Sequence, residues 1–376
     1  MKIPLQRPYF DKAEERAVIE VLRSGWVAQG PKVVEFEELF CKYTGAKYAI
    51  ATTSATSALF LSLHFLGIGK GDEVIVPSLS FIATANVVIH TGATPVFVDI
   101  DPQTYNINPD KVEEKITKKT RAIIPVDQVG LPCDLDRITK IAKKYRLHII
   151  EDAACALGSI YESRRIGSFN HLSCFSFHPR KPITTGEGGI IATNNKAFAE
   201  KLRILRHQGM GISDIARHTA KKITIQEGYP IIGYNFRMSD IQAAVGVEQM
   251  KKLPQILSMR AKLAERYTKA FAKSKVIISP IVPKGSVHNW QTYVVRVKPK
   301  GKLTRDALMK KMFDSGIGVR IGIMASHIEA PYKKLYPKLK LPETELAAKE
   351  TMALPLYPQM TIKEQDYVIK KILEFT

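Results

Sequence analysis

The sequence has only four cysteines, at positions 41, 133, 155 and 174. None of them forms a Cys-x-x-Cys pair or a cluster with histidine, and no His-Glu-x-x-His motif is present. Zinc and iron–sulfur centres need ligands at such spacings. We therefore expect free thiols and no metal site.

Long apolar runs are also missing, so no segment is predicted to cross a bilayer. Residues 1–8 lack the apolar core of a signal peptide. Internal repeats and low-complexity segments are absent as well. We expect a cytoplasmic protein that does not bind membranes.

Acidic residues are few relative to basic ones: 36 against 56, for a formal net charge of +20. Such a charge can attract nucleic acid, an anionic membrane or an anionic small molecule. The lysines are scattered, as in Lys140, Lys143 and Lys144, and no basic block alternates with aromatics. This pattern favours steering of an anionic substrate and argues against nucleic acid as a partner.

Apolar, β-branched segments alternate with helical patterns in the first two thirds of the chain. The predicted strands are residues 47–53, 73–77, 95–100, 122–126, 148–152, 172–177 and 189–193, with helices at 54–66, 81–90 and 135–144. Strands without polar alternation indicate a sheet covered on both faces. Ligands of such α/β sheets bind at the strand ends.

The pattern changes near Leu253-Pro254. A charged helix at 256–273 is predicted to follow a helix that ends near Met250, and a β segment comes at 290–297. Further helices are expected at 305–315, 343–352 and 362–374. We divide the chain into a large domain, residues 1–252 with an N-terminal segment 1–30, and a small α+β domain, residues 253–376.

Lys181 stands in an unusual position. The apolar strand at 172–177 leads into a polar turn that closes with Gly186-Glu187-Gly188-Gly189. An amine acts as a nucleophile only in its unprotonated form, which burial near cations such as Arg180 favours. Most lysines are solvated surface residues, but the flanking residues favour a Schiff-base lysine here.

Other polar residues follow predicted strands. Asp152 ends the strand at 148–152 and could hold a pyridinium N–H, or could simply cap a turn. Ser54, Ala55 and Thr56 open a helix whose N-terminus could bind phosphate, although serine and threonine also cap helices. Phe81 could stack on a flat ring or belong to the core.

Taken in this order, these residues make the chain resemble the DegT/DnrJ/EryC1/StrS family of aminotransferases, which use pyridoxal 5'-phosphate (PLP). The motif SFHPRK at 176–181, followed by TTGEGG at 184–189, is the most specific part of the resemblance. It extends over almost the whole chain and includes GYNFRMSD at 233–240. It implies fold type I: a mostly parallel seven-stranded sheet between helices, with a smaller α+β C-terminal domain.

The resemblance also implies residue roles. Lys181 would form the internal aldimine and move protons, Asp152 would pair with the pyridine nitrogen, and Phe81 would stack on the ring. The phosphate would be held by Ser54, Ala55, Thr56 and Ser176, and by Asn235 of a neighbouring subunit. An obligate homodimer with composite sites follows.

Three departures from the family pattern concern the site. Cys155 stands where many relatives have glutamine or histidine at the ring's 3-oxygen, and thiols are weaker hydrogen-bonding groups. Asp127-Gln128 replaces a common histidine in a loop expected to face the substrate. Ala55 stands where glycine is frequent, and its backbone N–H contact should be preserved.

Substrate contacts are expected from Trp26, Gln29 and His327. Two loops are further candidates: residues 206–232, with Arg217 and His218, and residues 320–332.

The resemblance implies transfer of an amino group, with L-glutamate as donor, to a keto group of a nucleotide-linked (deoxy)sugar. The cofactor would alternate between PLP and pyridoxamine phosphate (PMP), within polysaccharide biosynthesis. The alternatives are a PLP-fold sugar dehydratase, whose branch has histidine in place of Lys181, and a non-catalytic regulatory or nucleic-acid-binding member.

Overall fold

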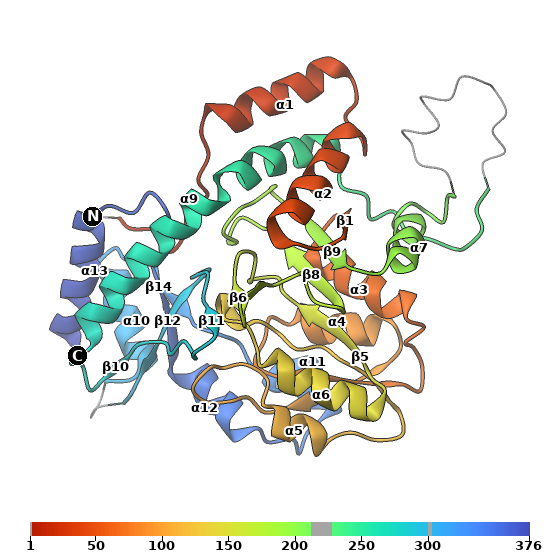
Figure 1. Cartoon of the computed structure of the whole chain (residues 1–376). Coiled ribbons are helices and arrows are strands. Elements are labelled where there is room, and N and C mark those ends of the chain that lie inside the picture. Colours follow the sequence, from red (N-terminus) through yellow and green to blue (C-terminus); the bar gives the residue numbers. More distant parts are fainter. Residues whose placement is uncertain (1, 212–227, 300–302) are drawn as a thin grey trace.

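A seven-stranded sheet forms the centre of the computed structural model, which describes residues 2–211, 228–299 and 303–376 (Figure 1). Across the sheet the strands are β1 (Tyr48–Thr52), β9 (Gly189–Thr193), β8 (Leu172–Ser176), β5 (His148–Asp152), β4 (Thr120–Ile123), β2 (Glu73–Pro77) and β3 (Thr94–Val98). Only β9 runs antiparallel to its neighbours. All seven predicted strands are confirmed, with ends shifted by a few residues.

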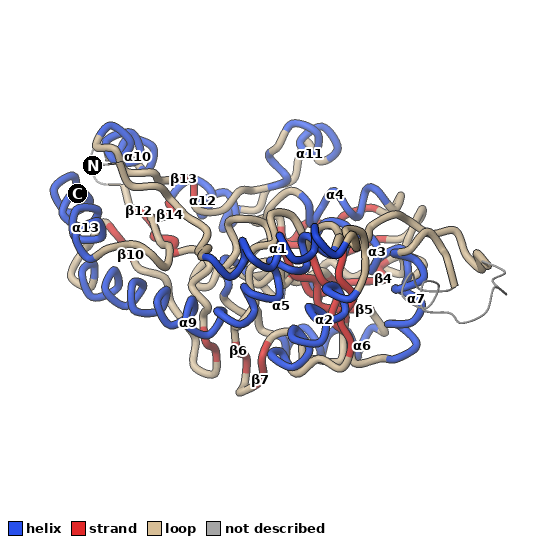
Figure 2. Tube along the Cα trace, turned by 90° about the horizontal axis from the view of Figure 1, so that it is seen from above, coloured by secondary structure: helices blue, strands red, loops and turns tan. Residues whose placement is uncertain are grey.

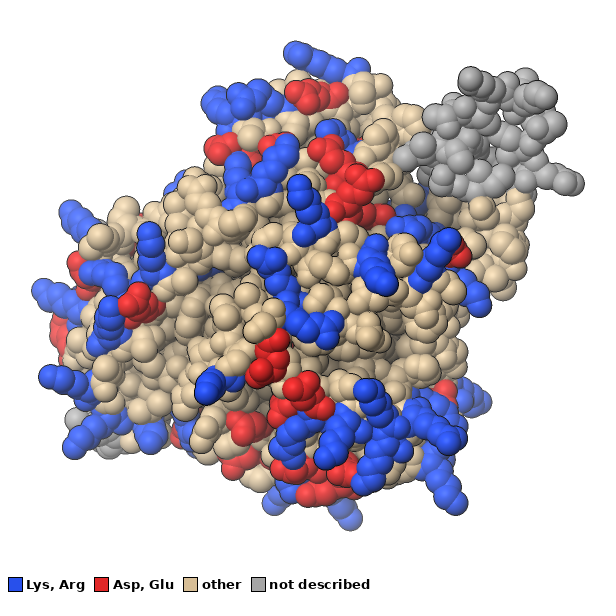
Figure 3. Space-filling model, viewed as in Figure 1, with Lys and Arg blue, Asp and Glu red and all other residues tan. Residues whose placement is uncertain are grey.

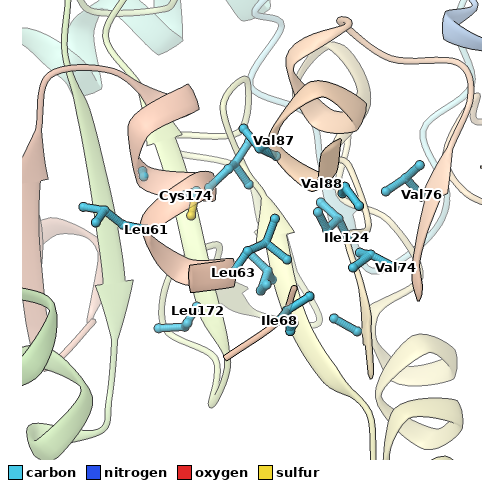
Figure 4. Packing of buried hydrophobic residues seen from close by; sticks show 14 of the residues in the cluster. Leu61, Leu63, Ile68, Val74, Val76, Val87, Val88, Ile124, Leu172 and Cys174 are labelled. Atoms are coloured by element: carbon cyan, nitrogen blue, oxygen red, sulfur yellow. The ribbon is translucent and has the colours of Figure 1, made fainter. Parts of the chain in front are cut away.

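Helices cover both faces of this sheet, as continuous apolar strands require. On one face, a buried cluster joins strand residues such as Val76 and Leu172 to Leu61 and Val87 of the covering helices (Figure 4). The helices of this face are α3 (Ala55–Phe65), α4 (Ala83–His90) and α7 (Lys196–Arg206). The other face packs on α2 (Pro31–Thr44), α5 (Pro109–Glu113), α6 (Leu135–Tyr145) and the first half of α9 (Asp240–Phe271).

The C-terminal part has its own core and lies at one end of the molecule (Figure 2). An antiparallel sheet is formed by β10 (Ile277–Ile278), β12 (Tyr293–Val297), β14 (Thr351–Leu354) and β13 (Arg320–Ile321). It packs on α10 (Arg305–Asp314), α13 (Ile362–Phe375) and the second half of α9.

The remaining elements are short or peripheral. They are α1 (Lys12–Ser24), which packs on α9, the small sheet of β11 (Ser286–Val287), β6 (Ile160–Tyr161) and β7 (Arg164–Arg165), the 3₁₀ turns η1 (Gln128–Gly130) and η2 (Ser326–Ile328), and the helices α11 (Ala330–Leu335) and α12 (Pro342–Glu350). Among the described residues, no helix combines the length and apolar character needed to span a membrane.

The predicted break near Leu253-Pro254 is wrong, because α9 continues through Pro254 for 32 residues. Proline removes one helical hydrogen bond and typically costs about 3 kcal/mol in a helix interior. Met250, Leu253 and Ile256 are all buried around it. Burial of these side chains against the sheet outweighs the local penalty.

The end of the predicted helix at 343–352 is also wrong. The helix α12 ends at Glu350, and the next residues form β14, which pairs with β12 and β13. The proposed boundary between residues 252 and 253 falls inside α9, and Tyr332 packs against the core of the large sheet. The two-domain division stays a prediction.

Ser239 caps α9, and we expect its loss to destabilise the protein. Its hydroxyl accepts the backbone N–H of Gln242, whose side chain returns to the Ser239 backbone. Ser239→Ala should lower the free energy of unfolding by about 1 kcal/mol. Ser258→Ala, at an exposed interior position of the same helix, should be neutral or slightly stabilising. Equal effects in urea denaturation would contradict the capping role.

Candidate active site

The predicted site residues lie at one edge of the seven-stranded sheet. β1, β2, β5 and β8 run in the same direction, so their carboxyl ends meet there. Ser54 and Phe81 follow β1 and β2, whereas Asp152 and Ser176 are the last residues of β5 and β8. The fold therefore brings together groups that are far apart in the sequence.

The start of α3 forms an anion-binding surface with the end of β8. Ser54 caps the helix by accepting a first-turn N–H, while Ala55 and Thr56 belong to the turn whose amides have no intrahelical partner. A Cβ on Gly189 would lie 2.3 Å from the Ser54 carbonyl carbon, so only glycine permits this approach. Ser176 is paired with Gly189 in the sheet. These backbone amides and hydroxyls suit a phosphate group.

Asp152 presents a buried carboxylate at the same edge, with only 6% of its surface exposed. One oxygen accepts the Thr84 hydroxyl at 2.8 Å and the other accepts the Ala154 N–H at 3.2 Å. Burial raises the pKa of Asp152, against the opposing effects of the Thr84 hydrogen bond and the Lys181 charge. An additional positively charged N–H donor would stabilise this carboxylate.

Phe81 is 61% exposed, which is unusual for a large aromatic side chain that follows a core strand. Its carbonyl accepts the N–H of Thr84, the residue that binds Asp152. The ring therefore belongs to the turn beside the buried carboxylate. An exposed aromatic face in this position suits stacking on a flat ring.

Lys181 is half-buried, and its Nζ donates a hydrogen bond to the Cys155 Sγ at 3.1 Å. Its backbone N–H bonds to the His178 carbonyl at 2.8 Å, which closes the turn after β8. The structure therefore places the Lys181 amine at the edge of the sheet, as the sequence predicts. The direct contact with Cys155 was not predicted, nor was the role of Thr84, whose sequence context carries no distinguishing signal.

The N-terminal segment with Trp26 and Gln29 is fixed beside the start of α9. The Trp26 indole N–H donates to the Gln29 carbonyl at 3.0 Å. The Asp240 carboxylate accepts backbone N–H groups of Gly30 and Lys32 at 2.7 and 3.0 Å. The role of Trp26 and Gln29 in substrate binding stays a prediction.

His327 is buried, and its expected role in substrate binding stays a prediction. The residue is 2% exposed, its Nδ1 lies 2.7 Å from the Ser78 hydroxyl, and its Nε2 lies 3.3 Å from a Glu345 carboxylate oxygen. It joins η2 to the end of β2. Arg217 and His218, also expected to contact substrate, lie outside the described residues.

Asp127 and Gln128 are buried. Asp127 is fully buried, accepts the Cys133 N–H at 2.9 Å and is repelled by the charge of the neighbouring Glu151. The Gln128 amide donates to the Leu79 carbonyl. Both side chains hold core elements together, and the role of this loop in substrate preference stays a prediction.

Asn235 is exposed, and its amide oxygen accepts the Arg237 guanidinium at 3.1 Å. The next residue, Phe236, accepts the Thr53 N–H at 3.0 Å, so this segment lies beside the start of α3.

This fold and this set of groups define a fold type I PLP-dependent transferase. A family model described as the DegT/DnrJ/EryC1/StrS aminotransferase family matches residues 8–373. The chain therefore belongs to that family, and it is a PLP-dependent sugar aminotransferase. An uncharacterized protein of Methanocaldococcus jannaschii is 40% identical over 96% of this chain and 94% of its own length.

Solved structures agree with this assignment. Helicobacter pylori PseC, an aminotransferase involved in the biosynthesis of pseudoaminic acid, superimposes with a TM-score of 0.92 at 30% identity, covering 100% of this chain and 99% of its own. The Spr1654 protein of Streptococcus pneumoniae, in its PLP form and its PMP form, gives a TM-score of 0.91 at 30% identity, covering 99% and 98%.

The chain's own residues fit this cofactor. The first-turn amides of α3 suit the phosphate, the buried Asp152 carboxylate suits a ring N–H, and the exposed Phe81 suits the ring face. Lys181 supplies the amine.

The buried Asp127–Glu151 pair should make stability depend on pH. Burial and the Glu151 charge raise the pKa of Asp127 well above its usual value. A raised pKa favours folding below the pKa of the unfolded carboxyl, and this contribution is lost as pH rises towards the folded pKa. Asp127→Asn keeps the acceptor for the Cys133 N–H and removes the charge that faces Glu151. Relative to wild type, its free energy of unfolding should increase between pH 4 and pH 8 by on the order of 1 kcal/mol. A constant difference would contradict a raised pKa of Asp127 in the folded protein.

Proposed function

We propose that this enzyme transfers an amino group from L-glutamate to the keto group of a nucleotide-linked (deoxy)sugar. The observation that carries the proposal is the Lys181 amine, at the same sheet edge as the Asp152 carboxylate and the N-terminus of α3. When bound, PLP supplies an electron sink for reactions at the carbon next to an amine.

Each residue has a defined task in this proposal. Lys181 holds the cofactor covalently and then moves a proton to or from the reacting carbon. Asp152 keeps the ring nitrogen protonated through its negative charge. The first-turn amides of α3 and the Ser176 hydroxyl hold the phosphate, and Phe81 covers one face of the ring.

The nucleotide-linked substrate is supported by the charge of the chain. Lysine and arginine are distributed over the face seen in Figure 3, with acidic residues between them. Such a surface raises the local concentration of an anionic diphosphate without forming a nucleic-acid-binding stripe. A sugar as the acceptor agrees with the solved structures, several of which are described as sugar aminotransferases. The cytoplasmic location and a role in polysaccharide biosynthesis stay predictions.

The alternative functions lack such support. The dehydratase branch has histidine where this chain has Lys181. A nucleic-acid-binding protein would bind DNA or RNA with an affinity that falls steeply with salt.

The first experiment tests Lys181. After incubation with PLP and borohydride reduction, mass spectrometry should place the cofactor on Lys181, and L-glutamate should bleach the visible band of the unreduced enzyme. Lys181→Ala should abolish both signals, whereas Lys196→Ala, at an exposed lysine, should leave them unchanged. Amino transfer by Lys181→Ala at a normal rate would overturn the assignment.

A second experiment tests the nucleotide. A keto-sugar without its nucleotide should be used with a kcat/KM lower by on the order of 100-fold than the nucleotide-linked keto-sugar, because remote binding energy contributes to catalysis.

We further propose a homodimer in which Asn235 completes the partner's phosphate site. Apolar side chains flank this residue on the surface: Ile231 is 40% exposed and Ile232 is 90% exposed. Exposed apolar residues on one segment are typical of an interface.

Mixing two inactive variants tests the composite site. Lys181→Ala removes the amine, and Asn235→Asp places a carboxylate against the phosphate. If Asn235 acts on the partner, the heterodimer has one intact site, and a refolded equimolar mixture should recover about a quarter of wild-type activity. If Asn235 acts within its own chain, mixing will restore nothing.

A further inference from the structure

A four-residue stretch, His288–Gln291, in which all residues but the partly buried Trp290 are buried, joins the C-terminal part of the chain to the candidate active site. Trp290 has a left-handed backbone with φ of 56°, and its N–H is accepted by the His288 ring at 2.9 Å. The buried guanidinium of Arg260 in α9 donates to the Trp290 and Gln291 carbonyls at 3.0 and 3.2 Å. This stretch, which we call the clasp, is therefore held from α9.

Asn289 connects the clasp to the loop that follows β5. Its amide donates to the carbonyls of Cys155 and Leu157 at 2.7 and 2.9 Å, and its oxygen accepts the Gln291 N–H at 2.9 Å. Gly130 leaves the space for this amide, because a Cβ there would lie 1.8 Å from the Asn289 Oδ1. The backbone at Cys155 is thus fixed by a residue of the clasp.

Gln291 connects the same clasp to the lysine turn. It is 5% exposed, and its amide N–H₂ donates to the Arg180 carbonyl at 2.7 Å. Its amide oxygen accepts the Thr292 hydroxyl at 2.9 Å, which fixes the orientation of the amide. Arg180 directly precedes Lys181, so this hydrogen bond restrains the peptide that carries the reactive amine.

The two clasp residues therefore hold both partners of one contact, the hydrogen bond of 3.1 Å from the Lys181 Nζ to the Cys155 Sγ. A lysine has four rotatable side-chain bonds, and its amine can be placed accurately only if its backbone is fixed. A misplacement of about 1 Å at a reacting group can cost on the order of 100-fold in rate.

We propose that Gln291 is a positioning residue for Lys181: it makes the placement of the amine depend on the C-terminal part of the chain. The proposal rests on the role of Lys181 as the cofactor-binding lysine. Gln291 acts through the Arg180–Lys181 backbone and does not itself take part in the chemistry.

The test compares Gln291→Met with Gln365→Met. Gln365 is also fully buried, and its amide donates to the Leu263 carbonyl at 2.7 Å, in the C-terminal core and not at the lysine turn. Each variant loses one buried amide-to-carbonyl hydrogen bond, so we expect similar losses of thermal stability.

Only Gln291→Met should disturb Lys181. For this variant we expect the rate at which borohydride traps PLP on Lys181, and the affinity for PLP, to fall by on the order of tenfold. We also expect kcat to fall while KM for the sugar stays within about twofold, because the substrate groups are untouched. Gln365→Met should match wild type in all three measurements.

Equal trapping rates for the two variants would overturn the proposal, because Gln291 would then have only a structural role. If Gln291→Met does not fold, Thr292→Val removes only the hydroxyl that orients the Gln291 amide, and it must show the same changes to a smaller degree. Failure of the wild-type enzyme to trap PLP on Lys181 would instead disprove the proposed function.

Discussion

The active site depends on the antiparallel insertion of β9 between β1 and β8. This direction places the first residue of β9, Gly189, at the edge where its neighbours end. Gly189 pairs with Ser176 and touches the backbone of Ser54, an approach that any side chain would prevent. The loop between β8 and β9 must turn at the same edge, and it carries Lys181. One reversal of strand direction therefore brings phosphate site and amine together.

Much of this arrangement could be predicted from the sequence, because it rests on local signals. Buried strands of a covered sheet are continuous apolar runs, so all seven were identifiable. Ser54 is an ordinary capping residue at the start of its helix, and Asp152 is a charged residue at the end of a strand. Functional groups at strand ends are found from strand prediction alone, since parallel strands end at one edge.

The parts that could not be predicted depend on contacts between distant residues. Pro254 indicates a helix end locally, yet packing on the sheet keeps α9 continuous. His327 is as polar as a substrate ligand, but the fold buries it between Ser78 and Glu345. Gln291 lies 111 residues from Arg180, and no local pattern connects them. Such residues gain their roles only when the core has formed.

The end of β5 shows how neighbouring carboxyls are given different tasks. Glu151 and Asp152 are consecutive, so their side chains lie on opposite faces of the sheet. Glu151 lies on the core side, with its Oε2 3.2 Å from the His171 Nε2, and burial together with the Glu151 charge raises the pKa of Asp127. Asp152 faces the site, where burial raises its pKa while the Thr84 hydrogen bond and the Lys181 charge oppose that rise. Because the raised pKa of Asp127 favours its neutral form, there is less negative charge behind the strand, and Asp152 is the carboxylate that can stabilise a cationic ring nitrogen.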